Sequence, residues 1–310
     1  MTSVNNGRQA KPPPTVAFIF AFAAVYIIWG STYLAIRIAV SVLPPFLLAG
    51  ARFLLAGLIL ATWLAATRGF RPTPRQIRDN ALIGALLLAG GNAMIVWAEQ
   101  SIPSGVTTLI ISVNPLLFAL GDWALPGGKR PTTSTISGIT LGFVGLLLLA
   151  GPGGAAAVDL RRCGGILFAC ICWTAGSLYS RYAREPAEPL VGATVQMLCG
   201  SILILLIGLA NGEASHFAWT QVTGSAAVAW AYLVVAGSLI GYPCYVWLLK
   251  HSTPARASTY AYVNPVVAVF LGWRVLGEPI TARILFASAV IVVGVAIITW
   301  QKARLEKLKY

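Results

Sequence analysis

Long apolar runs of about 20 residues recur along almost the whole chain and leave few folds open to it. A helix of that length crosses the hydrocarbon core of a bilayer, and backbone groups within lipid must pair inside their own segment. The chain is 57% hydrophobic and only 10% charged, which is more apolar surface than a soluble domain buries. We therefore predict an all-α polytopic membrane protein.

Turn residues divide these runs into ten predicted spans. Proline and glycine mark the breaks, as in Leu43-Pro44-Pro45 and Gly151-Pro152-Gly153-Gly154. The first run continues to Val40, which favours an uncleaved span over a signal peptide. The predicted spans are 16–40, 46–66, 80–99, 105–125, 134–151, 163–182, 190–210, 226–249, 256–276 and 282–300.

The basic residues are distributed unevenly between the two predicted faces. With ten spans and a cytoplasmic N-terminus, most of the 22 lysines and arginines fall in cytoplasmic loops and tails. This bias predicts that both termini are cytoplasmic. The net charge of +13 is scattered over short loops, so it indicates topology and not a nucleic-acid-binding face.

The two halves of the chain carry matching residues at nearly constant offsets. Trp29 in the first span matches Trp173 in the sixth, and Gly91 in the third matches Gly241 in the eighth. Five spans in each half is an odd number, so the second half enters the membrane from the opposite face. We therefore predict two inverted five-helix repeats, the geometry that alternating access uses.

Asn-Pro pairs interrupt the fourth and ninth spans. Proline removes one helical hydrogen bond and clashes with the preceding turn, so kinks are predicted at Pro115 and Pro265, and likewise at Pro243 in the eighth span. Broken helices at matching positions of two halves point to a transport site. The alternative is that prolines are common in membrane helices whatever their role.

Several motifs give the chain a family resemblance that covers nearly all of it after the first 15 residues. They are Trp29-Gly-Ser-Thr-Tyr33 with Arg37, Arg52-Phe-Leu-Leu-Ala-Gly57, Pro103-Ser-Gly105, the stretch Ser258 to Gly272, and Leu276-Gly-Glu-Pro279. The chain resembles the drug/metabolite transporter superfamily, specifically its EamA-type permeases and their YedA-like bacterial inner-membrane members. One departure is that the family's Gly-Glu motif, present as Gly277-Glu278, reads Gly127-Gly128 in the first half.

The resemblance implies a fold, a location and a function. Ten helices would form two inverted repeats around a central cavity walled mainly by helices one, three, four, six, eight and nine. The expected segments are a cytoplasmic tail at 1–15, a first repeat at 16–152, a second at 160–300 and a basic cytoplasmic tail at 301–310. The expected function is secondary transport in the bacterial inner membrane, with export of amino acids or other small metabolites.

Aromatic and amide residues on the cavity-forming spans are the candidate solute site. Aromatic faces near a cation suit a flat or amino-bearing solute, and an amide offers two donors and an acceptor. The alternatives are an interfacial aromatic belt for the tryptophans and helix-to-helix hydrogen bonds, worth about 0.6 kcal/mol, for the amides. The predicted cavity residues are Trp29, Tyr33, Asn92, Asn114, Trp173, Tyr242, Tyr260 and Asn264.

Two carboxylates lie near a span interior and are candidates for proton coupling. Ionisable groups within a bilayer often form proton relays, and Glu99 and Asp122 are the nearest to such a place. Glu99 ends the third span and is expected to be in contact with water. Arg52, the one basic residue well inside a span, is expected either to snorkel toward the outer face or to pair with a carboxylate.

The competing functional class is a polytopic membrane enzyme acting on a lipid-linked substrate. Such chemistry usually needs clustered acids or a histidine with a carboxylate, yet the only histidines, His216 and His251, are predicted on opposite sides. We therefore expect no catalytic residue, metal or cofactor. The expected partners are a small metabolite, aromatic solutes included, and membrane lipids. The Gly138-x-x-x-Gly142 face leaves monomer and homodimer open.

Overall fold

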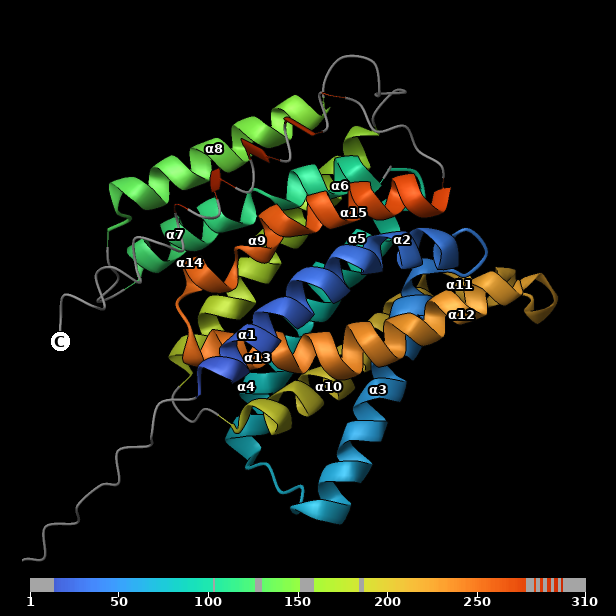
Figure 1. Ribbon diagram of the computed structural model, residues 1–310. Coiled ribbons are helices and arrows are strands. Elements are labelled where there is room, and N and C mark those ends of the chain that lie inside the picture. The colour runs from blue at the N-terminus through green and yellow to red at the C-terminus, as the bar shows by residue number, and fades with distance from the viewer. Residues whose placement is uncertain are drawn as a thin grey trace, which may run out of the picture.

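A computed structural model describes residues 14–102, 104–125, 130–150, 159–183 and 187–276, together with scattered positions between 282 and 297. Regular structure in these residues is helical, and they include no strand (Figure 1). The predicted tenth span, 282–300, lies largely outside them.

The helices pass back and forth through one bundle. Six stretches are long and apolar enough to cross a membrane among the described residues: Thr15–Val40, Pro45–Thr67, Pro74–Ala98, Leu160–Arg181, Pro189–Ala210 and Gly224–His251. In chain order the helices are α1 (Thr15–Ala23), η1 (Ala24–Ile28), α2 (Trp29–Val40), α3 (Pro45–Thr67), α4 (Pro74–Gly84), η2 (Ala85–Ala93), α5 (Met94–Ala98), α6 (Ser104–Ile111), α7 (Asn114–Ala124), α8 (Thr133–Ala150), α9 (Leu160–Tyr182), α10 (Pro189–Ala210), α11 (Glu213–His216), η3 (Trp219–Gln221), α12 (Gly224–Tyr232), η4 (Leu233–Gly241), α13 (Tyr242–His251), α14 (Pro254–Ala257) and α15 (Tyr260–Leu276).

Several helices begin where the local sequence favours a start. Proline occupies the first turn of α3 and α10, where its missing amide hydrogen costs nothing. The start of α4 is a capping box, because the Thr73 hydroxyl accepts from the Gln76 amide while the Gln76 side chain accepts from the Thr73 amide. These starts fix where each helix enters the bundle.

The start of α3 is capped from a distant part of the chain. Glu213 in α11 accepts hydrogen bonds from the amides of Phe46 (3.2 Å) and Leu47 (2.8 Å). A carboxylate is well placed there, because helix N-termini carry unpaired N–H groups and a positive partial charge. Burial raises the pKa of the Glu213 carboxyl, and the two amide hydrogen bonds act in the opposite direction.

Matching π-helical segments occupy the middles of two spanning helices. Segment η2 lies between α4 and α5, and η4 lies at the corresponding place between α12 and α13. A third segment, η1, lies between α1 and α2. Such segments are rare and are often found at functional sites, and η2 and η4 supply buried residues such as Leu88 and Ser238.

The first Asn-Pro sequence lies at a helix break, whereas the second lies inside a helix. In the first half α6 ends at Ile111 and α7 begins at Asn114, so Pro115 lies in the first turn of a new helix. In the second half the break separates α14 from α15, and Pro265 lies inside α15. Pro243 lies in the first turn of α13, directly after η4.

Helices from the two halves of the chain pack against one another. Helix α9 packs on η2, α10 packs on α3, and α15 runs beside α2 (Figure 1). The contact of α4 with α10 needs glycine, because a Cβ atom at Gly200 would lie 2.9 Å from the Gly84 backbone oxygen.

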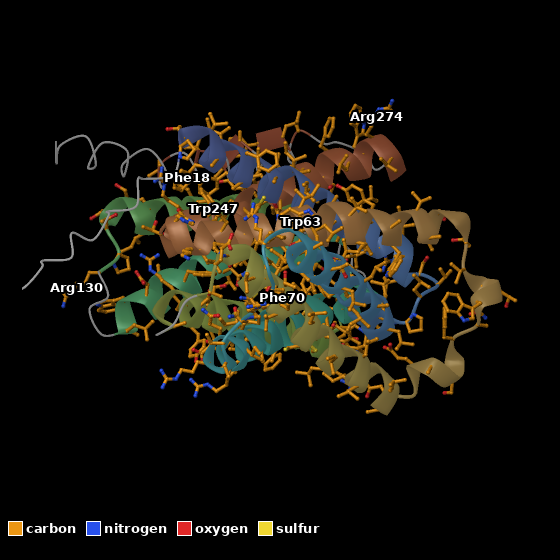
Figure 2. The ribbon with its side chains drawn as sticks, turned by 90° about the horizontal axis from the view of Figure 1, so that it is seen from below. Phe18, Trp63, Phe70, Arg130, Trp247 and Arg274 are labelled. Atoms are coloured by element: carbon orange, nitrogen blue, oxygen red, sulfur yellow. The ribbon has the colours of Figure 1, made fainter. Side chains whose placement is uncertain are left out.

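The outer surface suits a lipid environment. Large apolar side chains such as Ile19, Leu206 and Phe270 are exposed, as expected where hydrocarbon replaces water. Charged residues such as Arg130 and Arg274 lie at opposite ends of the molecule (Figure 2).

A candidate solute site at the centre of the bundle

A small cavity of about 50 Å³ lies where helices from both halves meet. Seven of the eight predicted cavity residues line it, and Asn264 does not. Its lining consists of Trp29, Thr32, Tyr33, Ile36, Arg52, Phe53, Leu88, Asn92, Ile95, Ile111, Asn114, Ala169, Cys170, Trp173, Gly237, Tyr242 and Tyr260. Ligand sites commonly measure roughly 300–1,000 Å³, so this cavity is too small to hold a solute unless the surrounding helices move.

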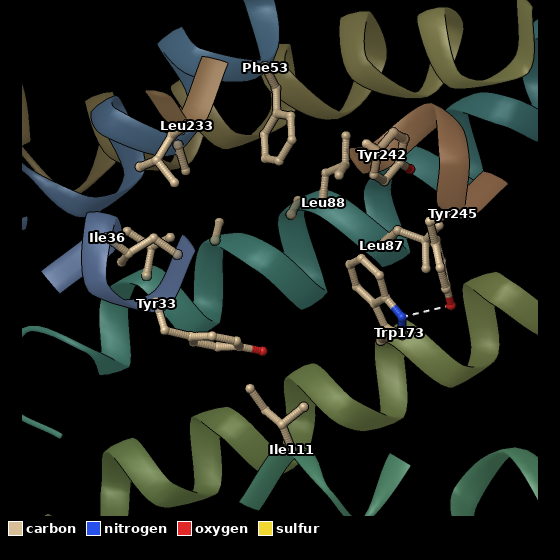
Figure 3. Close-up of a cluster of buried hydrophobic side chains, with 14 of the residues drawn as sticks. Tyr33, Ile36, Phe53, Leu87, Leu88, Ile111, Trp173, Leu233, Tyr242 and Tyr245 are labelled. Atoms are coloured by element: carbon tan, nitrogen blue, oxygen red, sulfur yellow. Dashed lines mark hydrogen bonds between the residues drawn. The ribbon is translucent and has the colours of Figure 1, made fainter. Parts of the chain in front are cut away.

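Four aromatic rings form a cluster that we call the aromatic wall, and three of them, Trp29, Trp173 and Tyr260, line the cavity. The Trp29 ring contacts Trp173, Tyr245 and Tyr260, with centroid distances of 5.5, 5.0 and 5.3 Å. The Trp173 indole donates to the Tyr245 hydroxyl at 2.8 Å, and the Tyr33 ring extends toward them from α2 (Figure 3). Trp29 and Trp173 therefore lie at the centre of the protein and not in an interfacial belt.

The two tryptophans pack on glycines in a reciprocal manner. A Cβ atom at Gly91 would lie 2.8 Å from Trp173 Cε3, and one at Gly241 would lie 2.6 Å from Trp29 Nε1. Gly91 lies in the last turn of η2 and Gly241 ends η4, and each ring comes from the other half of the chain. The same local packing is thus built twice, with the partners exchanged between halves.

Arg52 is buried beside the cavity, and the expectation that it snorkels outward is wrong. Its side chain is 3% exposed, its Nε donates to the Ser238 hydroxyl at 2.8 Å, and its guanidinium carbon lies 4.4 Å from the Phe53 ring centroid. Its Nη1 has no hydrogen-bond partner, and no salt bridge between residues that the structure describes includes it.

Amide groups add polar character to the same space. The side-chain oxygens of Asn92 and Asn114 accept no hydrogen bond from the part of the chain that is described. Asn264 is also buried, but its amide nitrogen, oriented toward two carbonyls, donates to the backbone oxygens of Tyr260 and Tyr26 at 3.1 Å each. Asn264 therefore joins α15 to η1.

The two candidate coupling carboxylates lie in different environments. Glu99 is fully buried, and within the described structure neither of its carboxyl oxygens has a hydrogen-bond partner, so the expectation of contact with water is wrong. Arg37 donates to the backbone oxygens of Glu99 (2.5 Å) and Gln100 (3.1 Å). Asp122 is half-buried in the last turn of α7 and is not part of the cavity lining.

Larger cavities lie toward each end of the helices. One of about 1,040 Å³ is bordered by Pro44, Trp97 and Glu213, and one of about 320 Å³ by Asn80, Arg181 and Gln196. We call them the Glu213-side and Asn80-side cavities.

A hydrogen-bonded chain runs from the Asn80-side cavity to the central one. Tyr242 donates to the Gln196 side-chain oxygen at 2.8 Å, and the Gln196 nitrogen donates to the Asn80 side-chain oxygen at 2.7 Å. Tyr242 lines the central cavity, and Asn80 and Gln196 line the Asn80-side cavity. These side chains thus occupy the space between the two cavities.

Sequence reasoning missed Tyr245, and it singled out Arg52 without placing it among the cavity residues. Tyr245 joins the aromatic wall and also contacts the Ser177 hydroxyl at 2.7 Å. A charged residue within an apolar run is a functional candidate by default, and this signal was enough to select Arg52.

Among the described residues, no group of histidine, cysteine, aspartate or glutamate side chains is arranged to hold a metal.

The fold agrees with the comparison to known proteins. The profile of the EamA-like transporter family matches the chain twice, at residues 16–151 and 163–300. The chain belongs to the EamA-like transporter family. A crystal structure with 22% sequence identity has the same fold, with a TM-score of 0.76 over 95% of this chain and 100% of its own.

Relatives of this EamA-like protein are named as transporters. The inner-membrane transporter YedA of Escherichia coli K12, itself uncharacterized, is 38% identical over 283 residues, which cover 91% of this chain and 90% of YedA. The transporter YvbV of Bacillus subtilis is 23% identical over 96% of this chain and 95% of its own. A probable terminal-alkyne amino-acid exporter of Streptantibioticus cattleyicolor is 24% identical over 90% of this chain and 92% of its own.

Proposed function

We propose that this EamA-like protein is a secondary transporter that exports amino acids or similar small metabolites by alternating access. The main support is the small central cavity, which both halves of the chain line and which lies between two larger cavities. A solute would enter from one side, be enclosed at the centre and leave on the other side. The name of the S. cattleyicolor relative supports amino acids as the substrate class.

The repeated packing of tryptophan on glycine supports the inverted-repeat mechanism. The Gly91–Trp173 and Gly241–Trp29 contacts are equivalent by sequence offset. Two equivalent contacts allow two equivalent arrangements, in which one contact loosens while the other stays closed. In this account both termini face the cytoplasm of a bacterial cell, and the Asn80-side cavity opens there.

Proton coupling through Glu99 belongs to the same proposal. A buried carboxylate without a partner is costly, so a proton on Glu99 would offset the cost of burial. Release of that proton would then follow when the surrounding helices open to water. Arg37, which contacts the Glu99 backbone oxygen, would stabilise the ionised state.

The proposal is tested by transport in proteoliposomes. Purified protein is reconstituted, and uptake of a panel of radiolabelled amino acids, amines and carboxylic acids is measured with and without an imposed pH gradient. We expect saturable movement of at least one amino acid, faster with the gradient. Movement of no solute in the panel would count against transport.

A matched pair of tryptophan variants tests the site. Trp29→Ala removes a ring from the central wall, whereas Trp63→Ala removes an exposed ring on α3. We expect about a tenfold loss of transport in the first variant and a change of less than about twofold in the second. Equal effects would place the site elsewhere.

A further inference from the structure

Arg52 carries a buried positive charge for which the described residues supply no counter-charge. The side chain is 3% exposed and is held by Ser238 and Phe53, neither of which is charged. An unpaired charge in an apolar interior is unfavourable, and proteins that keep one commonly use it to bind a partner of opposite sign. The guanidinium therefore points to an anionic group that is brought in by a ligand.

The position of the guanidinium fits that role. Ser238 binds only the Nε atom, which leaves the outer fork of the group with an unpartnered Nη1 in the wall of the central cavity. A Cβ atom at Gly237 would lie 3.4 Å from Nη2, so glycine at this position leaves room beside the fork. The planar fork of arginine matches a carboxylate with two parallel hydrogen bonds.

Two hydrogen-bond acceptors that lack donors line the same cavity. Asn92 and Asn114 each present a side-chain oxygen that no group in the described residues binds, and both residues line the cavity with Arg52. A ligand that meets these demands has an anionic end for the guanidinium and an N–H-rich cationic end for the amides. The rings of Trp29 and Trp173 bound the remaining, apolar part of the space.

We propose that Arg52 binds the carboxylate of a zwitterionic α-amino acid, and that Asn92 and Asn114 accept hydrogen bonds from its ammonium group. This assignment rests on the proposed transport function, since the cavity must open to admit such a solute. Arg52 is then the residue that makes a carboxylate a requirement for binding. Ser238 is a positioning residue, which holds the fork in place through Nε.

The test compares three matched probes on the intact protein in nanodiscs. Phenylalanine carries both charged groups, 3-phenylpropionate only the carboxylate, and phenethylamine only the ammonium. Binding is measured by the change in intrinsic tryptophan fluorescence and by inhibition of the amino-acid transport seen in liposomes. We expect the wild-type protein to bind phenylalanine best, 3-phenylpropionate next and phenethylamine at least about tenfold more weakly.

Arg52→Gln should remove this preference for a carboxylate. The affinity for 3-phenylpropionate should fall at least about tenfold while that for phenethylamine stays the same or rises. Arg52→Lys should retain part of the preference, because it keeps the charge without the fork. Arg68→Gln, at the exposed end of α3, serves as the control and should match the wild-type protein.

The outcomes separate the two proposals. If the wild-type protein binds or transports amines as strongly as carboxylates, the assignment of Arg52 is wrong, although the transport proposal still stands. This comparison uses the wild-type protein alone, so it does not depend on whether a variant folds. Equal losses for both single-charge probes in Arg52→Gln show a structural role only and also overturn that assignment. If no solute is bound or moved, both proposals are wrong.

Discussion

The reciprocal packing of tryptophan on glycine makes a quantitative prediction about stability. Gly91→Ala would place a methyl carbon 2.8 Å from Trp173 Cε3, and Gly241→Ala would place one 2.6 Å from Trp29 Nε1. Carbon atoms prefer separations of about 3.5–4.0 Å, so each ring must move by roughly 1 Å. Overpacking of this kind costs about 1–3 kcal/mol.

Alanine also favours a helix over glycine by about 0.8–1.0 kcal/mol, and a control must remove that effect. Gly164→Ala provides it, because Gly164 lies in α9 with nothing within 4 Å of the added carbon. The Gly91 and Gly241 variants should therefore each be about 1–3 kcal/mol less stable than Gly164→Ala. Reversible unfolding by sodium dodecyl sulfate in mixed micelles measures these differences.

A second substitution tests whether the ring is the cause. Trp173→Leu replaces the ring edge that the Gly91→Ala methyl would contact, so the double variant should be at least about 1 kcal/mol more stable than the sum of the single effects predicts. Additive effects, or a Gly91→Ala protein as stable as Gly164→Ala, would refute the reasoning.

Three further predictions concern gating, coupling and pH. Tyr242→Phe removes the hydrogen bond to Gln196, which is worth about 0.5–1.5 kcal/mol. Cys170 should then react with a thiol reagent added from the Asn80 side about two- to tenfold faster. An unchanged rate would show that this hydrogen bond does not control access to the central cavity. Glu99→Gln should leave transport unaffected by an imposed pH gradient, and retained acceleration would exclude Glu99 as the coupling group. The raised pKa of Glu213 stabilises the fold at pH values below the ordinary glutamate range, and this contribution is lost as the pH rises through the raised value. Thermal unfolding between pH 4 and 8 should therefore depend less on pH in Glu213→Gln, and an identical profile would contradict the assignment.

Much of the helical framework could be predicted from the sequence because lipid imposes a length on each apolar run. The predicted spans 46–66 and 190–210 agree with Pro45–Thr67 and Pro189–Ala210 to within one residue at each end. The start of the third helix was less accurate, at 80 instead of Pro74, because the first turns of α4 are polar and carry a capping box. Hydropathy does not detect a helix that extends beyond the lipid.

The site was only partly predictable, for a physical reason that differs between residues. The repeat selected Trp29 and Trp173, since each has a counterpart in the other half. Tyr245 has Ile95 at the matching position, so the repeat could not select it. The direction of the Arg52 side chain depends on Ser238 in η4, a contact between spans two and eight that no local pattern encodes.

The most direct test of alternating access uses a cysteine that is already in the cavity wall. Cys170 is 1% exposed and lines the central cavity, so a rigid core would protect it fully. With the other four cysteines replaced, its reaction with a membrane-impermeant methanethiosulfonate is followed in right-side-out and inside-out vesicles. Alternating access predicts reaction from both faces, slowed by a transported solute. Reaction from one face only, or from neither, would contradict it.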